Sequence, residues 1–415
     1  MSETGTAARV AYYGDDFTGS VDVLLQFARH GWSGRLFTAD PDDALLARAV
    51  AEGVEVIGIA GISRSLDSAA LTAEVTPRLA QLLRTGAPLI QYKACSTADS
   101  APEVGSIGRV IEIGREVVGT AVVPMLFAQP DFGRYTVFGQ HFAAENGVVH
   151  RLDRQPTMSN HPSTPMHEAD LARHFSAQTD LPIGGIARTD FDDLASRIDA
   201  SSAAAVVLDG LDEGDLRAVG RAMVELSGPR LVIGSGGLSW AIGSTDSRSG
   251  AGIPRTGTAT GPILAVSGSR SAATRRQAQA AADAGWLVLP FDDDAVQLPR
   301  VLAALSAGRS VVLTADDAVL PDDVQPLVAI AAAAARAVRT AAEAGVTRRI
   351  VVAGGDTSGR VTRLLGVDSV SIAANPTDNV VLLTAHSVIP AIDGLELLLK
   401  GGQVGADSLL TSLLA

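Results

Sequence analysis

Short apolar runs alternate with longer amphipathic stretches along the chain. The first run is Val10-Ala11-Tyr12-Tyr13, and an amphipathic segment from Val21 to Arg29 follows it. The later runs of strand length are 54–60, 88–92, 121–126, 205–208, 231–233, 263–267, 287–289, 310–313 and 350–353. Helical patterns lie between most of them, the clearest at 271–284 and 324–345. Strands that alternate with helices predict parallel sheets with crossover connections, and therefore an α/β protein.

A polar stretch rich in glycine, serine and threonine interrupts this alternation at 243–262. Such a composition is typical of a linker. The chain of 415 residues is also too long for one typical hydrophobic core. We therefore expect two domains, 1–245 and 260–415, each with a mainly parallel sheet flanked by helices.

The composition excludes several classes of partner. A net charge of −13 argues against nucleic acid, although a local basic pocket can still bind an anionic substrate. The single cysteine, Cys95, can form neither a disulfide framework nor a cysteine zinc site, which fits a reducing cytoplasm. No apolar stretch is long enough to span a bilayer, and the polar N-terminus has no signal core. We expect a cytoplasmic protein without a membrane or nucleic-acid partner.

One glycine turn in the second half of the chain predicts a phosphate site. The apolar run 350–353 ends at Gly354-Gly355, and Asp356 and Thr357 then offer side chains that can cap a helix. Two glycines before a helix let backbone N–H groups approach an oxyanion, and the helix start adds partial positive charge. The alternative is an ordinary turn that binds nothing, since the pattern matches neither the Walker A motif nor the dinucleotide fingerprint.

Two more turns of small residues lie in the same half of the chain. Gly268-Ser269-Arg270-Ser271 separates an apolar run from a helical pattern, and Gly401-Gly402 lies near the C-terminus. Each turn alone is a weak signal. Together with the turn at Gly354, they favour a nucleotide-binding domain.

The first half of the chain carries charged residues where predicted strands end. In parallel sheets, ligands bind beyond the carboxyl ends of the strands. Asp15 and Asp16 follow the first run, where they can bind a sugar hydroxyl, hold Mg²⁺, act as a base, or merely cap the next helix. Arg64 follows the run 54–60 and can clamp a carboxylate, unless it is an ordinary surface arginine.

A third strand end combines a lysine, hydroxyl groups and an acid. The residues of interest after the run 88–92 are Lys93, Cys95, Ser96, Thr97 and Asp99. Recognition of polyols and acid sugars needs this mixture of donors and acceptors. Cys95 is not favoured as a nucleophile, because no histidine in the sequence is an obvious base partner for it.

A histidine-containing segment at 161–171 offers a choice between metal binding and structure. His161, His167, Glu168 and Asp170 are metal-ligand types, but their spacing matches no zinc signature. The Ser-Thr-Pro sequence at 163–165 instead predicts the start of a helix.

Five short motifs, spread in order along the chain, carry a specific resemblance. They are Gly14-Asp15-Asp16-Phe17-Thr18-Gly19, Ser63-Arg64-Ser65, Pro162-Ser163-Thr164-Pro165-Met166, Gly268-Ser269-Arg270-Ser271 and Gly354 to Gly359. They resemble the motifs of the four-carbon acid sugar kinase family, formerly known only as a domain of unknown function.

This resemblance implies an ATP-dependent kinase whose first domain binds a small acid sugar and whose second domain binds the nucleotide with Mg²⁺. The residues carried over to the sugar are Asp15, Asp16, Arg64, Lys93, Cys95, Ser96, Thr97 and Asp99. Those carried over to ATP are Ser269, Gly354, Gly355, Asp356, Thr357 and Gly402. Asp16 or Asp99 would orient and deprotonate the acceptor hydroxyl, and the sequence does not choose between them. It assigns no metal ligand and leaves the oligomeric state open, a homo-oligomer included.

The third substrate motif departs from the family pattern. Where typical members have aspartate and arginine, this chain has Cys95 and Asp99. A carboxylate in place of a guanidinium reverses the charge near the substrate, so simple threonate or erythronate fits less well than a branched or oxo acid sugar. The altered motif is similar to a subgroup that includes 3-oxo-isoapionate kinase. The alternatives are a non-catalytic sensor of sugar acids and a dehydrogenase, and the latter is disfavoured because Gly-x-Gly-x-x-Gly is missing after the first strand.

Overall fold

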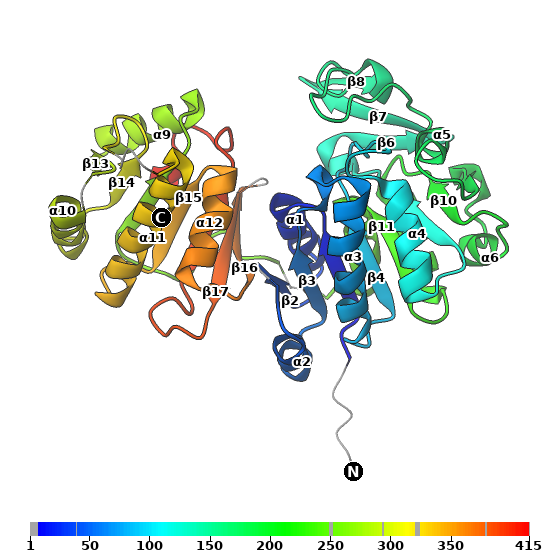
Figure 1. Ribbon diagram of the computed structural model, residues 1–415, viewed down its shortest axis with the longest axis horizontal. Helices are drawn as coiled ribbons and strands as arrows, with labels where there is room; N and C mark the ends of the chain where they lie inside the picture. The colour runs from blue at the N-terminus through cyan, green and yellow to red at the C-terminus, as the bar shows by residue number, and fades with distance from the viewer. Residues whose placement is uncertain are drawn as a thin grey trace, which may run out of the picture. The chain divides into compact units, whose positions relative to one another are not determined.

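The computed structural model describes residues 7–38, 40–248, 252–292, 294–319, 324–377 and 380–414. The chain forms two compact units, Met1–Gly252 and Ile253–Ala415. In each unit, helices flank a mainly parallel sheet, which confirms the predicted α/β class (Figure 1).

The sheet of the first unit is parallel throughout. Its strands, in spatial order, are β2 (Gly34–Phe37), β3 (Val56–Ala60), β1 (Val10–Gly14), β4 (Leu89–Lys93), β11 (Arg230–Gly234), β5 (Val123–Leu126), β10 (Ala205–Leu208) and β9 (Ile183–Ile186). The central strands β1, β4 and β11 are buried along their whole length. Helices on both faces explain why these strands are continuous apolar runs and do not alternate with polar residues.

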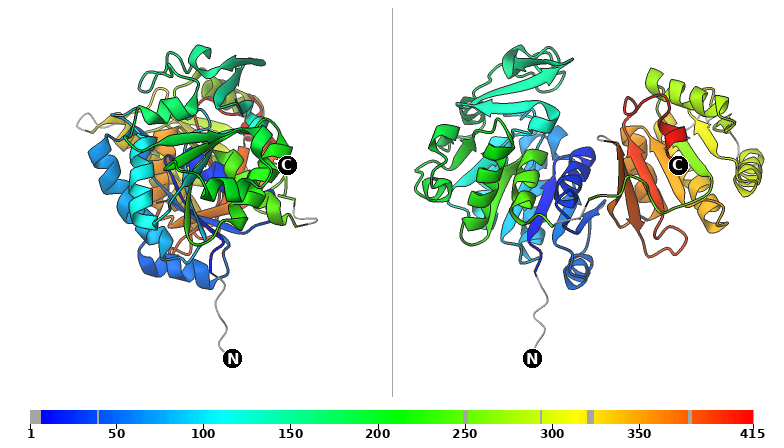
Figure 2. Two further views of the ribbon diagram at one scale, coloured as in Figure 1. Left: turned by 90° about the vertical axis from the view of Figure 1, so that its right-hand side faces the viewer. Right: turned by 180° about the vertical axis from the view of Figure 1, so that it is seen from behind.

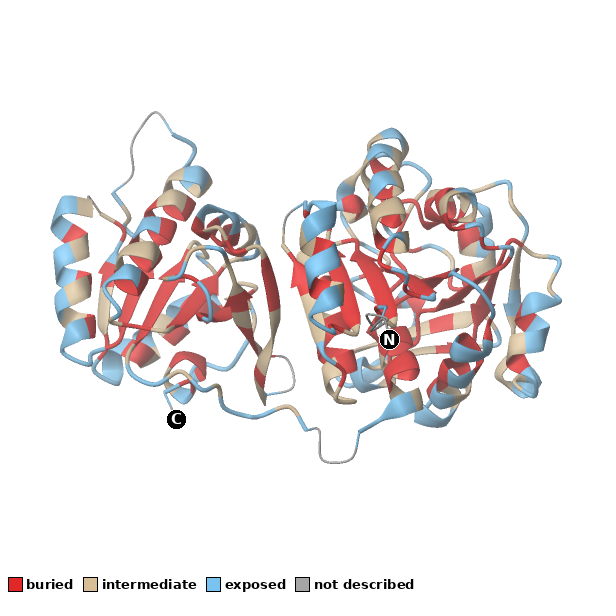
Figure 3. Cartoon of the chain, turned by 90° about the horizontal axis from the view of Figure 1, so that it is seen from below, coloured by how far each residue is buried: buried red, intermediate tan, exposed pale blue. Residues whose placement is uncertain are grey.

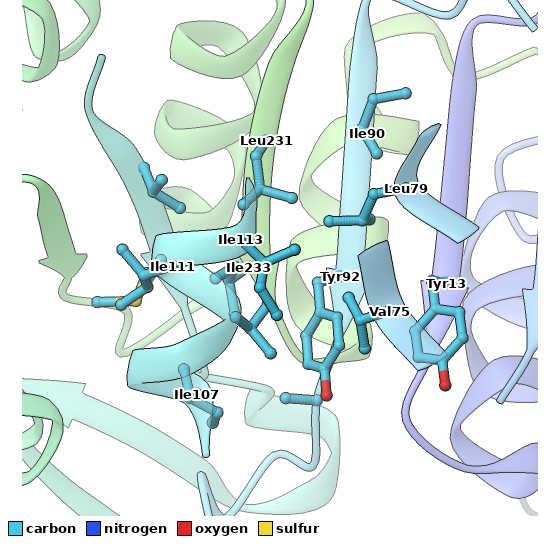
Figure 4. Packing of buried hydrophobic residues seen from close by; sticks show 14 of the residues in the cluster. Tyr13, Val75, Leu79, Ile90, Tyr92, Ile107, Ile111, Ile113, Leu231 and Ile233 are labelled. Carbon is cyan, nitrogen blue, oxygen red and sulfur yellow. The ribbon is translucent and has the colours of Figure 1, made fainter. Parts of the chain in front are cut away.

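Helices cover both faces of this sheet (Figures 1 and 2). On one face α3 (Ser68–Leu83) packs beside α4 (Ile107–Val118), and on the other α8 (Gly236–Gly243) contacts both α1 (Phe17–Ala28) and α7 (Glu213–Glu225). The shorter helices are α2 (Asp43–Ala51), α5 (Leu171–Ser176) and α6 (Leu194–Asp199). Figure 4 shows the α3–α4 side of the core, where Val75, Leu79 and Ile111 meet strand residues such as Ile90 and Leu231.

The helix start predicted at 163–165 is wrong. Helix α5 begins only at Leu171, and its N-cap is Asp170, whose side chain accepts the N–H of Arg173. The hydroxyl and the N–H of Thr164 both contact Nδ1 of His161, at 2.8 and 3.2 Å. This local contact forms a turn that competes with helix formation.

A small antiparallel sheet in the first unit was not predicted. It consists of β6 (Arg134–Val137), β7 (Gln140–Glu145) and β8 (Val148–Arg151). Its hairpin turns are Phe138-Gly139 and Asn146-Gly147, with positive φ at all four residues. Asn-Gly between short β-rich runs is a strong hairpin signal, so the second turn was readable from the sequence.

The sheet of the second unit is parallel except at one edge. Its order is β13 (Leu287–Pro290), β14 (Val311–Thr314), β12 (Ile263–Ser267), β15 (Arg349–Ala353), β18 (Glu396–Lys400), β17 (Val380–His386) and β16 (Ser369–Thr377). The pairings of β17 with β18 and with β16 are antiparallel. The predicted strands all lie within a few residues of observed ones, whereas β16 to β18 were missed.

The helices of the second unit are α9 (Ala272–Asp283), α10 (Asp294–Ser306), α11 (Pro326–Glu343), α12 (Gly355–Leu365) and α13 (Leu409–Ser412). Helix α11 contacts α10 and α12, while α9 contacts α13. The helices expose one side and bury the other against strands that are buried themselves (Figure 3). Within the described ranges, no helix has the length and apolar character needed to cross a membrane.

A buried ion pair anchors the start of the second unit. Arg349 Nε lies 2.9 Å from Glu396 Oε2, and both residues are almost fully buried. Glu396 Oε1 also accepts the N–H groups of Thr258 and Ala259. Part of the stretch predicted as a linker is therefore held against β15 and β18.

Candidate active site

The candidate substrate residues of the first unit follow strands that end at the same side of its sheet. Strands β3, β1 and β4 are parallel neighbours, so the residues that follow them meet at their carboxyl ends. Asp16 is the N-cap of α1, and its Oδ1 accepts the N–H of Gly19 at 2.6 Å. The capping role foreseen for this aspartate pair therefore belongs to Asp16, and Asp15 does not cap the helix.

Arg64 binds both aspartates. Its Nε and Nη2 donate to the two oxygens of Asp15 at 3.0 and 2.8 Å, and its Nη1 lies 2.7 Å from Asp16 Oδ2. Burial raises the pKa of Asp15, and the guanidinium offsets part of that rise. The fork geometry of arginine suits this paired arrangement. Because three of its nitrogens are already engaged, Arg64 has little capacity left to clamp a substrate carboxylate.

Two buried tyrosines position the Arg64 turn. The hydroxyls of Tyr92 and Ser63 lie 2.8 Å apart, and the N–H of Ile62 donates to the Tyr13 hydroxyl at 3.3 Å. The two tyrosine rings stack with centroids 5.8 Å apart, on neighbouring strands β1 and β4 (Figure 4). An apolar strand pattern does not reveal that these rings support a functional loop.

Lys93 is the last residue of β4 and is only 3% exposed. Its Nζ donates to the carbonyl of Ala94 at 2.8 Å. No carboxylate of the described residues forms an ion pair with it. An ammonium has three donors, so Lys93 can still bind an anion.

The segment after Lys93 holds an ionised acid and a neutral thiol. Thr97 donates its hydroxyl to Asp99 Oδ1 at 2.6 Å and lies 3.0 Å from the sulfur of Cys95. Burial acts to raise the pKa of Asp99, but the Thr97 hydrogen bond and Arg64 outweigh it and lower that pKa. Burial, reinforced by Asp99, raises the pKa of Cys95 to about 11. A thiol that stays protonated at neutral pH is a poor nucleophile, in line with the sequence reading.

A buried histidine, His141, and a partly buried one, His174, hold this segment, and the sequence singled out neither. His141, from β7, lies 2.8 Å from the Ser96 carbonyl through Nε2 and 2.9 Å from Thr136 Oγ1 through Nδ1. His174, from α5, lies 3.1 Å from Ser100 Oγ through Nε2. Both come from the parts of the unit whose structure was poorly predicted, so no sequence signal connected them to this loop.

Because His141 is buried, we expect the protein to lose stability in mild acid. Burial lowers the pKa of His141 to about 4. Between pH 6.5 and 4 the unfolded chain therefore binds a proton that the folded chain does not, and the free energy of unfolding falls as the pH falls. At pH 5 His141 alone should account for about 2 kcal/mol. Urea unfolding at pH 7.5 and 5 should show this difference reduced in His141→Gln and unchanged in His150→Gln, a matched substitution on β8. Equal pH dependence in all three proteins would contradict the prediction.

The three glycine turns of the second unit also meet at one sheet edge. They follow β12, β15 and β18, which are parallel neighbours. The N–H of Gly268 donates to Ala353 O at 3.0 Å, and the N–H of Gly354 donates to Lys400 O at 2.9 Å. The structure thus brings together turns that lie up to 134 residues apart, from Gly268 to Gly402.

Glycine is required at these turns because side chains already crowd them. A Cβ at Gly268 would lie 2.1 Å from Thr357 Oγ1, and one at Gly402 would lie 2.4 Å from Ser269 Oγ. Gly354 has φ of +116°, a backbone conformation that other residues rarely adopt. The contacts place Ser269 and Thr357 among the three turns.

The start of α12 faces open space. Gly354 is its N-cap, and the N–H groups of its first turn have no acceptor within the helix. A Cβ added at Gly355 would meet no atom within 4 Å. The side chain of Asp356 lies outside the described residues. Backbone donors next to open space at a helix start are suited to a phosphate.

Metal ligands are not grouped in the described ranges. Among those residues, no set of three or more histidine, cysteine, aspartate or glutamate side chains is placed to hold an ion. Mg²⁺ in nucleotide sites is held largely by phosphate oxygens and water, with few protein ligands. The hydroxyls of Ser269 and Thr357 beside the glycine turns are compatible with that mode.

Comparison with known proteins identifies the family. A model of a sugar-binding N-terminal domain matches residues 10–242, and a model of a nucleotide-binding C-terminal domain matches residues 264–410. The chain belongs to the four-carbon acid sugar kinase family. It is accordingly an acid-sugar kinase, with ATP as the implied phosphate donor.

Individual relatives agree with this assignment. The chain is 40% identical to a 3-oxo-isoapionate kinase of Paraburkholderia graminis, over 95% of this chain and 92% of the relative. It is 29% identical to a 3-oxo-tetronate kinase of Pseudomonas savastanoi pv. phaseolicola, over 94% and 93%. A crystal structure of a Haemophilus influenzae protein matches the fold with a TM-score of 0.74 at 22% identity, over 97% of this chain and 98% of that one.

Proposed function

We propose that this kinase phosphorylates a hydroxyl of a branched or oxo acid sugar, with 3-oxo-isoapionate as the first candidate and 3-oxo-tetronate as the second. The observation that carries the proposal is the Asp15–Arg64–Asp16 cluster beside the buried Lys93. The ordering of the candidates is supported by the higher identity to the 3-oxo-isoapionate kinase. Cys95 and Asp99 add support. Typical members have an arginine at the position of Asp99, so this chain presents a negative charge where they present a positive one.

Lys93 is the best-suited group for the substrate carboxylate. It is buried, it has donors to spare, and it lacks an ion-pair partner among the described residues. Arg64, which the sequence offered as an equal candidate, serves in this proposal to hold Asp15 and Asp16 in place. Ser96, Thr97 and Asp99 then bind sugar hydroxyls.

Asp16 is our choice for orienting the acceptor hydroxyl. Its side chain is 34% exposed, whereas the side chain of Asp15 is 6% exposed and is bound at both oxygens by Arg64. Asp99 is also largely buried. All three carboxylates already accept hydrogen bonds, so exposure is what distinguishes Asp16. A bound hydroxyl can reach Asp16 most readily. Phosphoryl transfer asks mainly for such positioning and charge stabilisation and needs little covalent chemistry from the protein.

The nucleotide would be held by the second unit. Backbone N–H groups at Gly354, Gly355 and Asp356 and the hydroxyls of Ser269 and Thr357 would bind the phosphates, with Gly402 leaving room for the side chain of Ser269. Mg²⁺, when bound to ATP, neutralises negative charge on the phosphate oxygens.

Gly355→Val tests this phosphate site. We expect the KM for ATP to rise roughly 10- to 100-fold, because the added side chain displaces a phosphate from one or two charge-assisted hydrogen bonds. The melting temperature should stay nearly constant, because a Cβ at this position meets no atom within 4 Å. Steady-state kinetics and thermal unfolding measure the two quantities. Gly359→Val, one turn further along α12 and equally uncrowded, is the control. An unchanged KM for ATP in Gly355→Val would refute the site.

A substrate screen tests the function as a whole. ADP release should be measured with threonate, erythronate, 3-oxo-tetronate and 3-oxo-isoapionate, and the phosphorylated carbon should be identified by NMR. We expect the highest kcat/KM with 3-oxo-isoapionate. A preference for threonate or erythronate would overturn the substrate assignment but leave the kinase class intact.

We further propose that the protein works in a reducing cytoplasm. The support is its single cysteine, which lies free and protonated in the sugar site. Oxidation there would add charge and bulk beside the substrate.

A further inference from the structure

The chain contains only two lysines, and both end buried parallel strands. Of its 33 basic residues, Lys93 and Lys400 are the lysines and the others are arginines. Lys93 ends β4 in the first unit, and Lys400 ends β18 in the second. Each is 3% exposed. Burying an ammonium is costly unless another charge or several hydrogen bonds compensate it.

Lys400 is poorly compensated within the described residues. Its Nζ donates to Gly401 O at 3.1 Å and to Thr274 Oγ1 at 3.4 Å. It forms no ion pair with any carboxylate that the structure describes. Burial, the sole cause, lowers its pKa to about 8. Charged neighbours on the packed elements are engaged elsewhere: Arg275 with Asp316, Arg276 with Asp407, and Arg349 with Glu396.

A short relay connects this ammonium to the glycine turns. Thr274, in the first turn of α9, lies 3.2 Å from Ser269 Oγ and 2.8 Å from Gly402 O, and its hydroxyl can donate to either oxygen. Ser271, the N-cap of α9, donates to Gly402 O at 2.5 Å. Lys400 is thus two hydrogen bonds from Ser269, and the side chains that the structure describes around it are hydroxyl groups without a negative charge.

We propose that Lys400 is a positioning residue whose buried charge is balanced by a nucleotide phosphate, acting on it through Thr274 and Ser269. The proposal rests on the proposed nucleotide site in this unit. In the free enzyme the buried ammonium lowers the free energy of unfolding, because nothing described nearby balances its charge. In the complex the phosphate supplies the missing negative charge, and the binding of ATP and the protonation of Lys400 favour one another.

Substitution separates this role from a purely structural one. In Lys400→Met the free protein should melt at the same or a higher temperature, because replacing an uncompensated buried charge with an apolar side chain of similar length removes its cost. The rise in melting temperature on adding ATP and Mg²⁺ should be largely lost. The KM for ATP should rise about 30-fold or more, as for other buried charge partners, while the KM for the acid sugar stays nearly constant. A lower melting temperature with the ATP-induced shift intact would mean that Lys400 only supports the turn, and would overturn the proposal.

Direct titration gives a second readout, which does not depend on turnover. Because there are only two lysines, protein labelled with ¹³Cε-lysine should give two side-chain NMR signals, which Lys93→Met assigns. The Lys400 signal should titrate with a midpoint near 8 in the free protein. With AMP-PNP and Mg²⁺ the midpoint should rise by at least about one pH unit, corresponding to a tenfold coupling.

The possible failures are distinguishable. If AMP-PNP binds and the Lys400 signal does not move, this inference fails and the proposed function stands. If AMP-PNP does not bind at all, the nucleotide site itself is wrong. If both lysine signals shift alike, the effect is a general change in the protein and the specific role of Lys400 is refuted.

Discussion

Asp16→Asn is expected to lower kcat by roughly 10²- to 10⁴-fold, the range typical of a lost general base. Asparagine cannot accept the proton of the acceptor hydroxyl, yet it caps a helix as well as aspartate does, so α1 should keep its start. The KM for ATP should hardly change, because the glycine turns lie in the other unit. Initial rates over a matrix of ATP and acid-sugar concentrations give both parameters.

The control for this variant is another capping aspartate. Asp42 is the exposed N-cap of α2 and accepts the N–H of Leu45 at 2.8 Å. Asp42→Asn should retain normal turnover. If Asp16→Asn also turns over normally, Asp16 has no catalytic role, and Asp99 becomes the candidate to test next.

Lys93→Met is expected to raise the KM for the acid sugar about 30-fold or more, because the substrate carboxylate would enter a buried site without its counter-charge. The KM for ATP should remain close to that of the wild-type enzyme. The test should compare the acid sugar with its neutral lactone, because the lactone has no carboxylate that could pair with Lys93. We expect the variant to lose its preference for the acid over the lactone.

The reciprocal lysine variant serves as the control. Lys400→Met should affect the KM for ATP and leave the acid–lactone preference intact. If Lys93→Met kept that preference, the carboxylate would have to be bound by another group, and Arg64 would return as the leading candidate despite its contacts to Asp15 and Asp16.

Cys95 shows how far a residue type can mislead. A lone cysteine in a polar loop invites a nucleophilic role, and the sequence argued against it only because no base was evident. The structure adds the physical reason: burial and the nearby Asp99 keep the thiol protonated. Its sulfur lies 3.0 Å from the hydroxyl of Thr97, so it is part of the loop that we propose to bind the sugar.

The sequence by itself determined the α/β architecture. It also located the charged residues that follow β1, β3 and β4 and the glycine turns that follow β12, β15 and β18. Buried parallel strands must be continuous apolar runs, so 205–208 and 263–267 were located to the residue. The antiparallel strands β16 and β17 and the hairpin strands β6 to β8 escaped because they are only partly buried and therefore lack a continuous apolar run. Local pattern carries little information about such strands.

Only the tertiary structure decided what each charged side chain does. Arg64 is bound by two aspartates 49 and 48 positions before it, and His141 holds the carbonyl of Ser96. Lys400 lies beside Thr274 and has no ion-pair partner in the part of the chain that the structure describes. Charge, burial and hydrogen bonding depend on which segments the sheets bring together. These contacts join residues far apart in the sequence, and no periodicity or motif encodes their distances.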